Sequence, residues 1–312
     1  MNLNLWEKIE PSPTEIKKDR KYWLIRTEAG TYYENYINNN YVAIGWNEFN
    51  NREDFSSKKM TEKMENDILA IDAYKEKQAG RIYNQIRKFL FDIKIGDVVM
   101  IPSENSEIIT FGIVNSDFFN REVSEDDTCP YIKSRSISWI KTIARNKLDP
   151  YLFKMMQSHQ TINNADDYAH YIDRTMYSYY EKDGKSYLIL PVNKNDDIPA
   201  YDLSQFINSI TDLIPTINKI FNSDNNKIDV DIKINVQSPG FVELNSTDKT
   251  LMQRISGFLK LSESKNSRKS INPIDEVLQR TSPANKDEML RNLDEIESKF
   301  KKVQAELPEE LK

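Results

Sequence analysis

The chain has 312 residues, of which 38% are hydrophobic and 11% aromatic, enough to bury the cores of two domains. Its two His, one Cys and eight Gly offer little to His-based acid–base catalysis, zinc sites, disulfide frameworks or Gly-rich phosphate loops. The net charge of −6 at pH 7 does not indicate nucleic-acid binding, although such binding depends on local patches of charge.

The sequence contains no stretch approaching the roughly 20 apolar residues that a transmembrane helix needs. Residues 1–8 lack the basic-then-apolar pattern of a secretory signal, and a single cysteine, Cys129, fits a reducing compartment. We therefore expect a cytoplasmic protein without a membrane span. His159 and His170 have no neighbouring ligand cluster, so we expect neither a metal nor a cofactor.

Residues 1–17 are predicted to form a short arm that Pro11 and Pro13 keep extended. The first predicted domain covers residues 18–160. Apolar and aromatic runs predict its strands at residues 22–26, 42–46, 98–101, 108–116 and 132–140. Apolar spacing predicts its helices at residues 32–40, 58–91 and 148–156.

The second predicted domain, residues 165–262, has α+β character. Its predicted helices are residues 165–180, residues 200–221 with a kink or break at Pro215, and residues 251–261. A strand is predicted at residues 187–192, and strict alternation of apolar and polar residues predicts a half-buried strand at residues 228–236.

Residues 263–272 have the composition of a linker, and residues 273–312 are predicted to be helical. A short helix at residues 273–280 precedes a longer one that Ser282 caps and Pro283 begins. Apolar residues then follow at alternating steps of four and three, in a heptad seam formed by Met289, Leu293, Ile296, Phe300, Val303 and Leu307. This seam must pack on the body of the protein or on another chain. Its spacing favours self-association, so we expect a homo-oligomer.

Five short motifs in the first domain carry a resemblance to a known family. They are Tyr22-Trp23-Leu24-Ile25-Arg26, Ala43-Ile44-Gly45-Trp46, Ile95-Gly96-Asp97-Val98-Val99, Phe111-Gly112-Ile113-Val114 and Arg135-Ser136-Ile137-Ser138-Trp139. In this order they resemble the EVE-like branch of the PUA superfamily. More narrowly, they resemble the N-terminal domain of Mrr-type and other modification-dependent restriction and phage-defence proteins. The resemblance covers residues 18–160, about half of the chain.

The resemblance implies a small, strongly curved β-barrel with flanking helices. It also implies a pocket that accepts a base flipped out of a duplex, often a methylated or otherwise modified base, without performing chemistry on it. The sequence departs from the family at one strand that normally ends in Gly-Asp-Tyr, because the corresponding stretch here is Asn115-Ser116-Asp117-Phe118-Phe119.

Three tryptophans, Trp23, Trp46 and Trp139, are candidates for stacking on such a base, with core aromatics as the alternative. Ser103 and Asp117 follow predicted strands, where they are candidates for hydrogen bonds to the base edge or are ordinary turn residues. Phosphate contacts are assigned to basic residues of the same domain, with a solvated surface as the alternative. These residues are Arg81, Arg87, Lys88, Lys133, Arg135, Lys141, Arg145 and Lys147.

The leading hypothesis is a non-catalytic sensor in a bacterial anti-phage defence or restriction system, reading a modified base in DNA or a nucleotide-like ligand and acting with a partner protein of that system. One alternative is a Mg²⁺-dependent nuclease, because Asp231-Ile232-Lys233 has the spelling of a restriction-nuclease site that Asp212 or Asp224 would complete. Strand alternation explains the same string without a function. A further alternative is a structural adaptor without a ligand.

Overall fold

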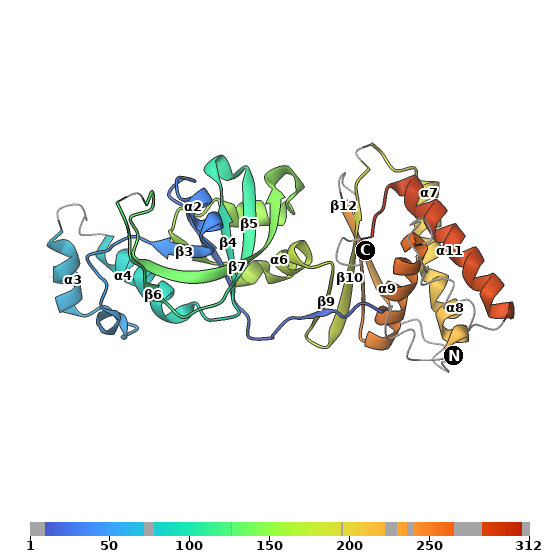
Figure 1. The fold of residues 1–312 in the computed structure, drawn as a ribbon, viewed down its shortest axis with the longest axis horizontal. Coiled ribbons are helices and arrows are strands. Elements are labelled where there is room, and N and C mark those ends of the chain that lie inside the picture. Colours follow the sequence, from blue (N-terminus) through green and yellow to red (C-terminus); the bar gives the residue numbers. More distant parts are fainter. Residues whose placement is uncertain are drawn as a thin grey trace. The chain divides into compact units, whose positions relative to one another are not determined.

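A computed structural model describes residues 10–71, 78–125, 127–194, 196–221, 230–235, 240–264 and 283–307. The chain divides into two compact units. One is Asp19–Met176, and the other combines Met1–Lys18 with Tyr177–Lys312. The predicted mixed α+β class is confirmed: the chain has an N-terminal curled sheet, a second sheet of five strands, and C-terminal helices (Figure 1).

The sheet of Asp19–Met176 has the strand order β3-β7-β5-β4-β2-β8, with β6 paired to β7. The strands are β2 (Tyr22–Ile25), β3 (Tyr41–Ile44), β4 (Val98–Pro102), β5 (Ile108–Val114), β6 (Phe119–Asn120), β7 (Lys133–Ala144) and β8 (Ile162–Asn164). All five predicted strands are confirmed, whereas β6 and β8 are too short to show a pattern in the sequence. In the described part of this unit β3 and β8 end the pairing order, so the expected curved barrel is a curled half-barrel sheet.

The curl of this sheet centres on the long strand β7. Its first four residues pair with β3, and the residues from Ile137 onward pair with β5. The register of β5 and β7 shifts between Phe111 and Gly112, as in a β-bulge. A Cβ atom on Gly112 would lie 2.4 Å from Ile137 Cγ2 and 2.7 Å from Trp139 Cε3, so glycine permits the close approach of the two strands.

The helices of this unit are α2 (Tyr33–Asn38), α3 (Glu62–Leu69), α4 (Ala79–Arg87), α5 (Tyr151–Met156) and α6 (Ala169–Met176). Short helical turns occur at η1 (Arg52–Phe55), η3 (Lys88–Asp92), η4 (Glu104–Ser106), η5 (Arg145–Lys147) and η6 (Asp166–Tyr168). The single helix predicted at residues 58–91 is therefore α3 and α4, with residues 72–77 outside the described part. The α4 spacing did identify core residues, since Ile82 and Ile86 are buried.

The first unit ends later than the predicted boundary at residue 160. Tyr22 in β2 donates a hydrogen bond of 2.7 Å to Asp173 in α6, and Arg174 pairs with Asp149. These long-range contacts hold α6 in the first unit. The helix predicted at residues 165–180 ends at Met176, and strand β9 follows it.

The second unit contains a sheet of order β1-β9-β10-β12-β11. Its strands are β1 (Thr14–Glu15), β9 (Tyr179–Lys182), β10 (Lys185–Val192), β11 (Asp231–Asn235) and β12 (Gly240–Ser246), and its helices are α7 (Ala200–Thr211), α8 (Leu213–Ile220), α9 (Lys249–Ser264) and α11 (Pro283–Val303). The extended arm supplies β1, which pairs in parallel with β9. The predicted break near Pro215 occurs at Asp212, between α7 and α8. Pro215 lies in the first turn of α8, where a proline does not remove a helical hydrogen bond. The first two residues of the predicted linker, 263 and 264, belong to α9. The rest of the linker and the helix predicted at residues 273–280 lie outside the described residues.

The heptad seam of α11 packs within its own chain. Five of its residues lie in α11, and Leu307 follows the helix. All six are at most 8% exposed and share one hydrophobic cluster with side chains of α7, α8 and α9. The structure therefore gives the first of the two alternatives, packing on the body. The assignment of Met289, Leu293, Ile296, Phe300, Val303 and Leu307 to oligomerisation is corrected, because these side chains already form the core of the second unit.

We expect Gly112→Ala to destabilise the first unit by about 1–3 kcal/mol, because the new methyl group must displace side chains of β7. Gly80→Ala is the matched control. Gly80 lies in α4 with nothing within 4 Å of an added Cβ, so this change should stabilise the unit by about 0.5–1 kcal/mol. Urea unfolding followed by tryptophan fluorescence measures both, and equal effects of the two variants would contradict the role of Gly112.

Leu293→Ala should lower the free energy of unfolding of the second unit by about 2–5 kcal/mol, because Leu293 is fully buried. Glu295 is exposed on the same helix, so Glu295→Ala should stay within about 0.5 kcal/mol of the original protein. Calorimetry measures stability, and light scattering measures mass. A Leu293→Ala protein that keeps its stability but loses mass would show that the seam joins two chains.

Candidate functional site

Two neighbouring hollows mark the candidate site in the first unit. The Trp46 hollow has a volume of about 320 Å³, and its lining residues are Arg26, Glu28, Gly45, Trp46, Tyr131 and Thr161. The Ser103 hollow has a volume of about 190 Å³, and its lining residues are Arg26, Thr27, Ala29, Gly30, Pro102, Ser103, Asn105 and Ser106. Arg26 lines both, so the two hollows adjoin at its side chain.

The Trp46 hollow lies between the two edges of the curled sheet. Ile44 and Lys133 are paired where β3 ends and β7 begins, so Trp46 and Tyr131 leave the sheet from the same point. Ile25 and Ile162 are paired at the corresponding point of β2 and β8, from which Arg26 and Thr161 emerge. Because β3 and β8 lie at opposite ends of the strand order, curling of the sheet brings these two sets of residues to one hollow.

Strained backbone conformations concentrate around both hollows. Six described non-glycine residues of this unit have positive φ, and all but Asn40 line a hollow. The five are Glu28, Ala29, Trp46, Asn105 and Ser106. A tryptophan at φ +58°, as in Trp46, is a rare conformation for a bulky side chain. Such strain costs on the order of 1–3 kcal/mol per residue and concentrates at binding sites, where the surrounding structure enforces it.

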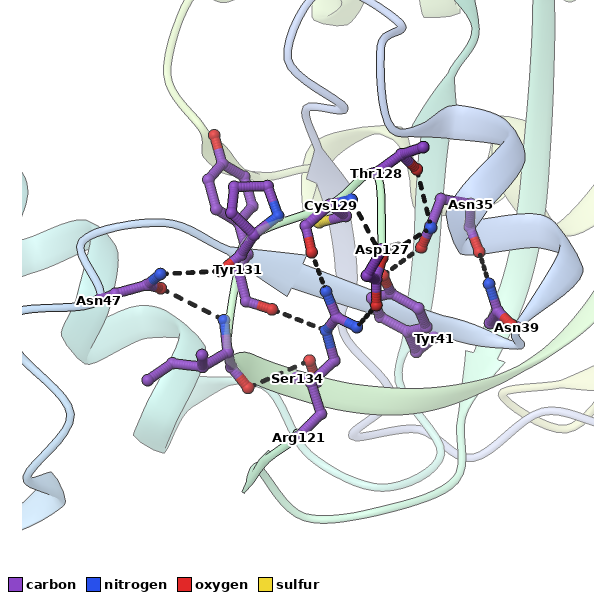
Figure 2. Close-up of polar contacts among 12 residues, drawn as sticks. Asn35, Asn39, Tyr41, Asn47, Arg121, Asp127, Thr128, Cys129, Tyr131 and Ser134 are labelled. Carbon is purple, nitrogen blue, oxygen red and sulfur yellow. Dashed lines mark hydrogen bonds and ion pairs between the residues drawn. The ribbon is translucent and has the colours of Figure 1, made fainter. Parts of the chain in front are cut away.

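A polar network fixes the segment that presents Tyr131. Figure 2 shows the Arg121 guanidinium between this segment and Asp127: it donates to the carbonyls of Tyr131 and Cys129 and pairs with Asp127. The hydrogen bond from Arg121 lowers the pKa of Asp127, which keeps the carboxylate charged. Asn47, just after Trp46, donates to Pro130 O at 2.8 Å and accepts from Ile132 N at 3.2 Å. These bonds fix the Trp46 segment against the Tyr131 segment.

The Tyr131 hydroxyl donates a hydrogen bond of 2.9 Å to Glu28 Oε2 across the Trp46 hollow. Burial and the neighbouring Glu28 raise the pKa of Tyr131, so the phenol remains a donor. A Cβ atom on Gly45 would lie 3.0 Å from the Tyr131 ring, which explains a small residue there. The hollow thus combines aromatic surface with a carboxylate of fixed position.

Lys133 holds the backbone of Trp46. Its ammonium group donates to Trp46 O at 2.7 Å, and the side chain is fully buried. Burial lowers the pKa of Lys133 to about 8, because the apolar surroundings disfavour the charged form. The assignment of Lys133 to phosphate contact is therefore corrected: the side chain supports the hollow from within the unit.

Arg26 is half-buried between the two hollows. Its Nε donates to Ser158 O at 3.1 Å, and its Nη2 donates to the carbonyls of Ser158 and Met156. Burial lowers the pKa of Arg26. These neutral carbonyls orient the guanidinium without neutralising its charge.

Of the five predicted ligand residues, Trp46 and Ser103 line the hollows, while Trp23, Trp139 and Asp117 do not. Trp23 is 3% exposed and its indole N–H donates to Asp97 Oδ2 at 2.9 Å, so it belongs to the core. Trp139 is half-buried and donates to Tyr36 O at 3.2 Å. Asp117 pairs with Arg52 at 3.0 Å and Arg135 at 3.3 Å. Ser103 also closes its own turn, because its hydroxyl accepts from Ile108 N at 2.9 Å.

The predicted phosphate contacts are similarly divided. Arg135 is 1% exposed, donates to Phe89 O and Ser116 O, and has a pKa lowered to about 10 by burial, so it too is a structural residue. Arg87 pairs with Asp92 at 2.8 Å. The other predicted contacts are at least partly accessible, with Arg81, Arg145 and Lys147 exposed, and Lys88 and Lys141 half-buried.

The residues of the nuclease alternative lie in the second unit, where β11 is an edge strand. Asp231 pairs with Lys185 at 3.6 Å, and Lys233 pairs with the buried Glu243 at 3.1 Å. Asp212 lies between α7 and α8, and Asp224 lies outside the described residues. Within the described ranges, no three His, Cys, Asp or Glu side chains form a group that could hold a metal ion.

The described ranges contain no helix that is both long and apolar enough to span a membrane.

Most lining residues were not predicted from the sequence, among them Arg26, Glu28, Tyr131 and Thr161 of the Trp46 hollow. Arg26 was visible only as the charged end of a strand motif, and Glu28 as part of the turn before Gly30. Tyr131 and Thr161 lie about a hundred or more positions from them, so no local pattern connects the set.

Comparison with known proteins gives one match. Residues 21–165 match a family described as Domain of unknown function (DUF8426). The match contains every residue that lines the two hollows. No curated protein and no solved structure matches the chain. The N-terminal part of the chain is therefore a DUF8426 domain with a curled half-barrel sheet.

The pKa of Lys133 predicts how stability depends on pH. The folded pKa of about 8 lies below the roughly 10.4 of an unfolded lysine, so the unfolded chain binds more protons between these pH values. The contribution of Lys133 to stability therefore rises with pH across this window, by up to about 3 kcal/mol, and is lost as pH falls through 8.

Lys133→Met removes the titrating group and keeps an unbranched apolar side chain. Urea unfolding at several pH values from 7.5 to about 10 should show the original protein gaining stability relative to this variant as pH rises. A constant difference between the two proteins would contradict the burial of Lys133.

Proposed function

We propose that the first unit binds a nucleobase in the Trp46 hollow, presented by a nucleotide flipped out of DNA, and that the chain is a non-catalytic cytoplasmic reader. The observation that carries this proposal is Trp46 itself, held in a strained conformation at the rim of a preformed hollow. An indole face stacks on any base, with about 1–3 kcal/mol per base. The hollow's volume lies at the lower end of the range for small-ligand sites, which suits a single base.

The polar groups of the hollow suit a base edge. The Glu28 carboxylate accepts hydrogen bonds, as an amino group of cytosine, adenine or guanine requires, and the Tyr131 hydroxyl orients it. A preference for a modified base, and a place in a bacterial defence or restriction system with a partner protein, come from the resemblance to EVE-like domains. A free nucleotide-like ligand is the alternative occupant of the same hollow.

The binding test uses duplexes that are identical except for one base, which is unmodified, methylated or hydroxymethylated. Fluorescence anisotropy should show tighter binding to one modified duplex, with affinity falling as salt concentration rises. Equal binding to all duplexes would refute recognition of a modification. An absence of binding to every duplex would refute the flipped-base proposal.

Trp46→Ala should weaken binding to the preferred duplex by about 5- to 150-fold, which corresponds to the loss of one stacked base. Tyr151→Ala is the matched control, because Tyr151 is a 63% exposed aromatic residue of the same unit outside both hollows. Circular dichroism establishes that both variants are folded. Equal loss of affinity in the two variants would exclude Trp46 as the stacking residue.

A further inference from the structure

We propose that the Ser103 hollow holds a phosphate of the nucleotide whose base occupies the Trp46 hollow, with Arg26 as the phosphate-binding residue between them. The inference rests on the proposed function and deepens it, because it makes the ligand a phosphorylated nucleotide unit and not a base or nucleoside alone.

Arg26 supplies the positive charge of this site. The guanidinium is half-buried, and its orienting partners are the carbonyls of Met156 and Ser158. Among the described residues none forms an ion pair with Arg26, and its lowered pKa has burial as its cause, without a compensating carboxylate. A partly desolvated cation gains most from an anionic ligand, and guanidinium groups match phosphate oxygens in geometry.

The two hollows differ in the charged residues that line them. The lining of the Ser103 hollow contains Arg26, hydroxyl and amide side chains and no acidic residue. Glu28 lines the Trp46 hollow instead, and Tyr131 holds its carboxylate there. Base edges offer amino donors, whereas phosphate oxygens are acceptors. The acceptor thus lies where a base would place its donors, and Arg26, which lines both hollows, is the only charged residue in the lining of the Ser103 hollow.

The loop that separates the two hollows is held in a fixed position. Thr27, 1% exposed, donates to Pro102 O, and a Cβ atom on Gly30 would lie 2.3 Å from the backbone of Glu104. Glu28 faces one hollow, while Ala29 and Gly30 face the other. The loop therefore separates the two hollows, and a nucleotide bound across it would place its base on one side and its phosphate on the other.

The test combines a change in the DNA with a change in Arg26. In the duplex that binds best, the linkage on each side of the read nucleotide is replaced, one at a time, by a neutral methylphosphonate. One of the two replacements should weaken binding to the original protein about tenfold. Arg26→Gln should weaken binding to the charged duplex by a similar factor and should be insensitive to that replacement. Arg26→Lys, which keeps the charge but not the planar fork, should lie between them.

The outcomes separate the two proposals. Full affinity for both methylphosphonate duplexes overturns the phosphate assignment and leaves base reading intact, and this measurement needs no variant to fold. If Arg26→Gln and the methylphosphonate each weaken binding and the two losses of affinity add in the combination, the phosphate contacts a residue other than Arg26. If no duplex binds, nucleosides and their 5′-monophosphates are compared: preference for the monophosphate supports Arg26 with a free nucleotide as ligand, and binding of neither refutes both proposals.

Discussion

The close approach of β5 and β7 at Gly112 is the constraint on which the candidate site depends. β7 is a long curved strand (Figure 1): its first residues pair with β3, and the remainder pair with β5, where Gly112 has no Cβ atom to block the approach. The bend curls the sheet and brings together the strand ends from which Trp46, Tyr131, Arg26 and Thr161 emerge. The hollow is thus a consequence of sheet curvature, and not of a loop added to a flat sheet.

The sequence was sufficient for five of the seven described strands of this sheet, because runs of buried β-branched and aromatic residues carry a local signal. It was not sufficient for the roles of the basic and aromatic residues. Trp23, Lys133 and Arg135 are residue types expected on a surface that binds nucleic acid, yet all three are buried. Their burial depends on distant partners such as Asp97 and the carbonyls of Phe89 and Trp46, which no window of sequence contains.

The second unit shows the same limit in a different form. The heptad seam of α11 correctly indicated which helix face is buried, since periodicity reports burial. It did not indicate the partner, because helices of one chain and helices of two chains satisfy the same seam. Similarly, Pro11 and Pro13 indicated an extended arm but not that Thr14–Glu15 would pair with β9, since parallel pairing joins segments far apart in sequence.

The strained loop between the hollows connects these structural facts to binding. Arg26 and Glu28 follow one strand at a spacing of two, which in a continued strand would place both side chains on one face. Left-handed backbone at Glu28 and Ala29 turns the chain after β2, so that Ala29 and Gly30 line the Ser103 hollow while Glu28 lines the Trp46 hollow. Each such conformation costs stability, and the anchoring of Thr27 to Pro102 maintains it. Glu28 lies on one side of this turn, and the lining on the other side contains no acidic residue. The proposed nucleotide, with donors on its base and negative charge on its phosphate, would match this arrangement.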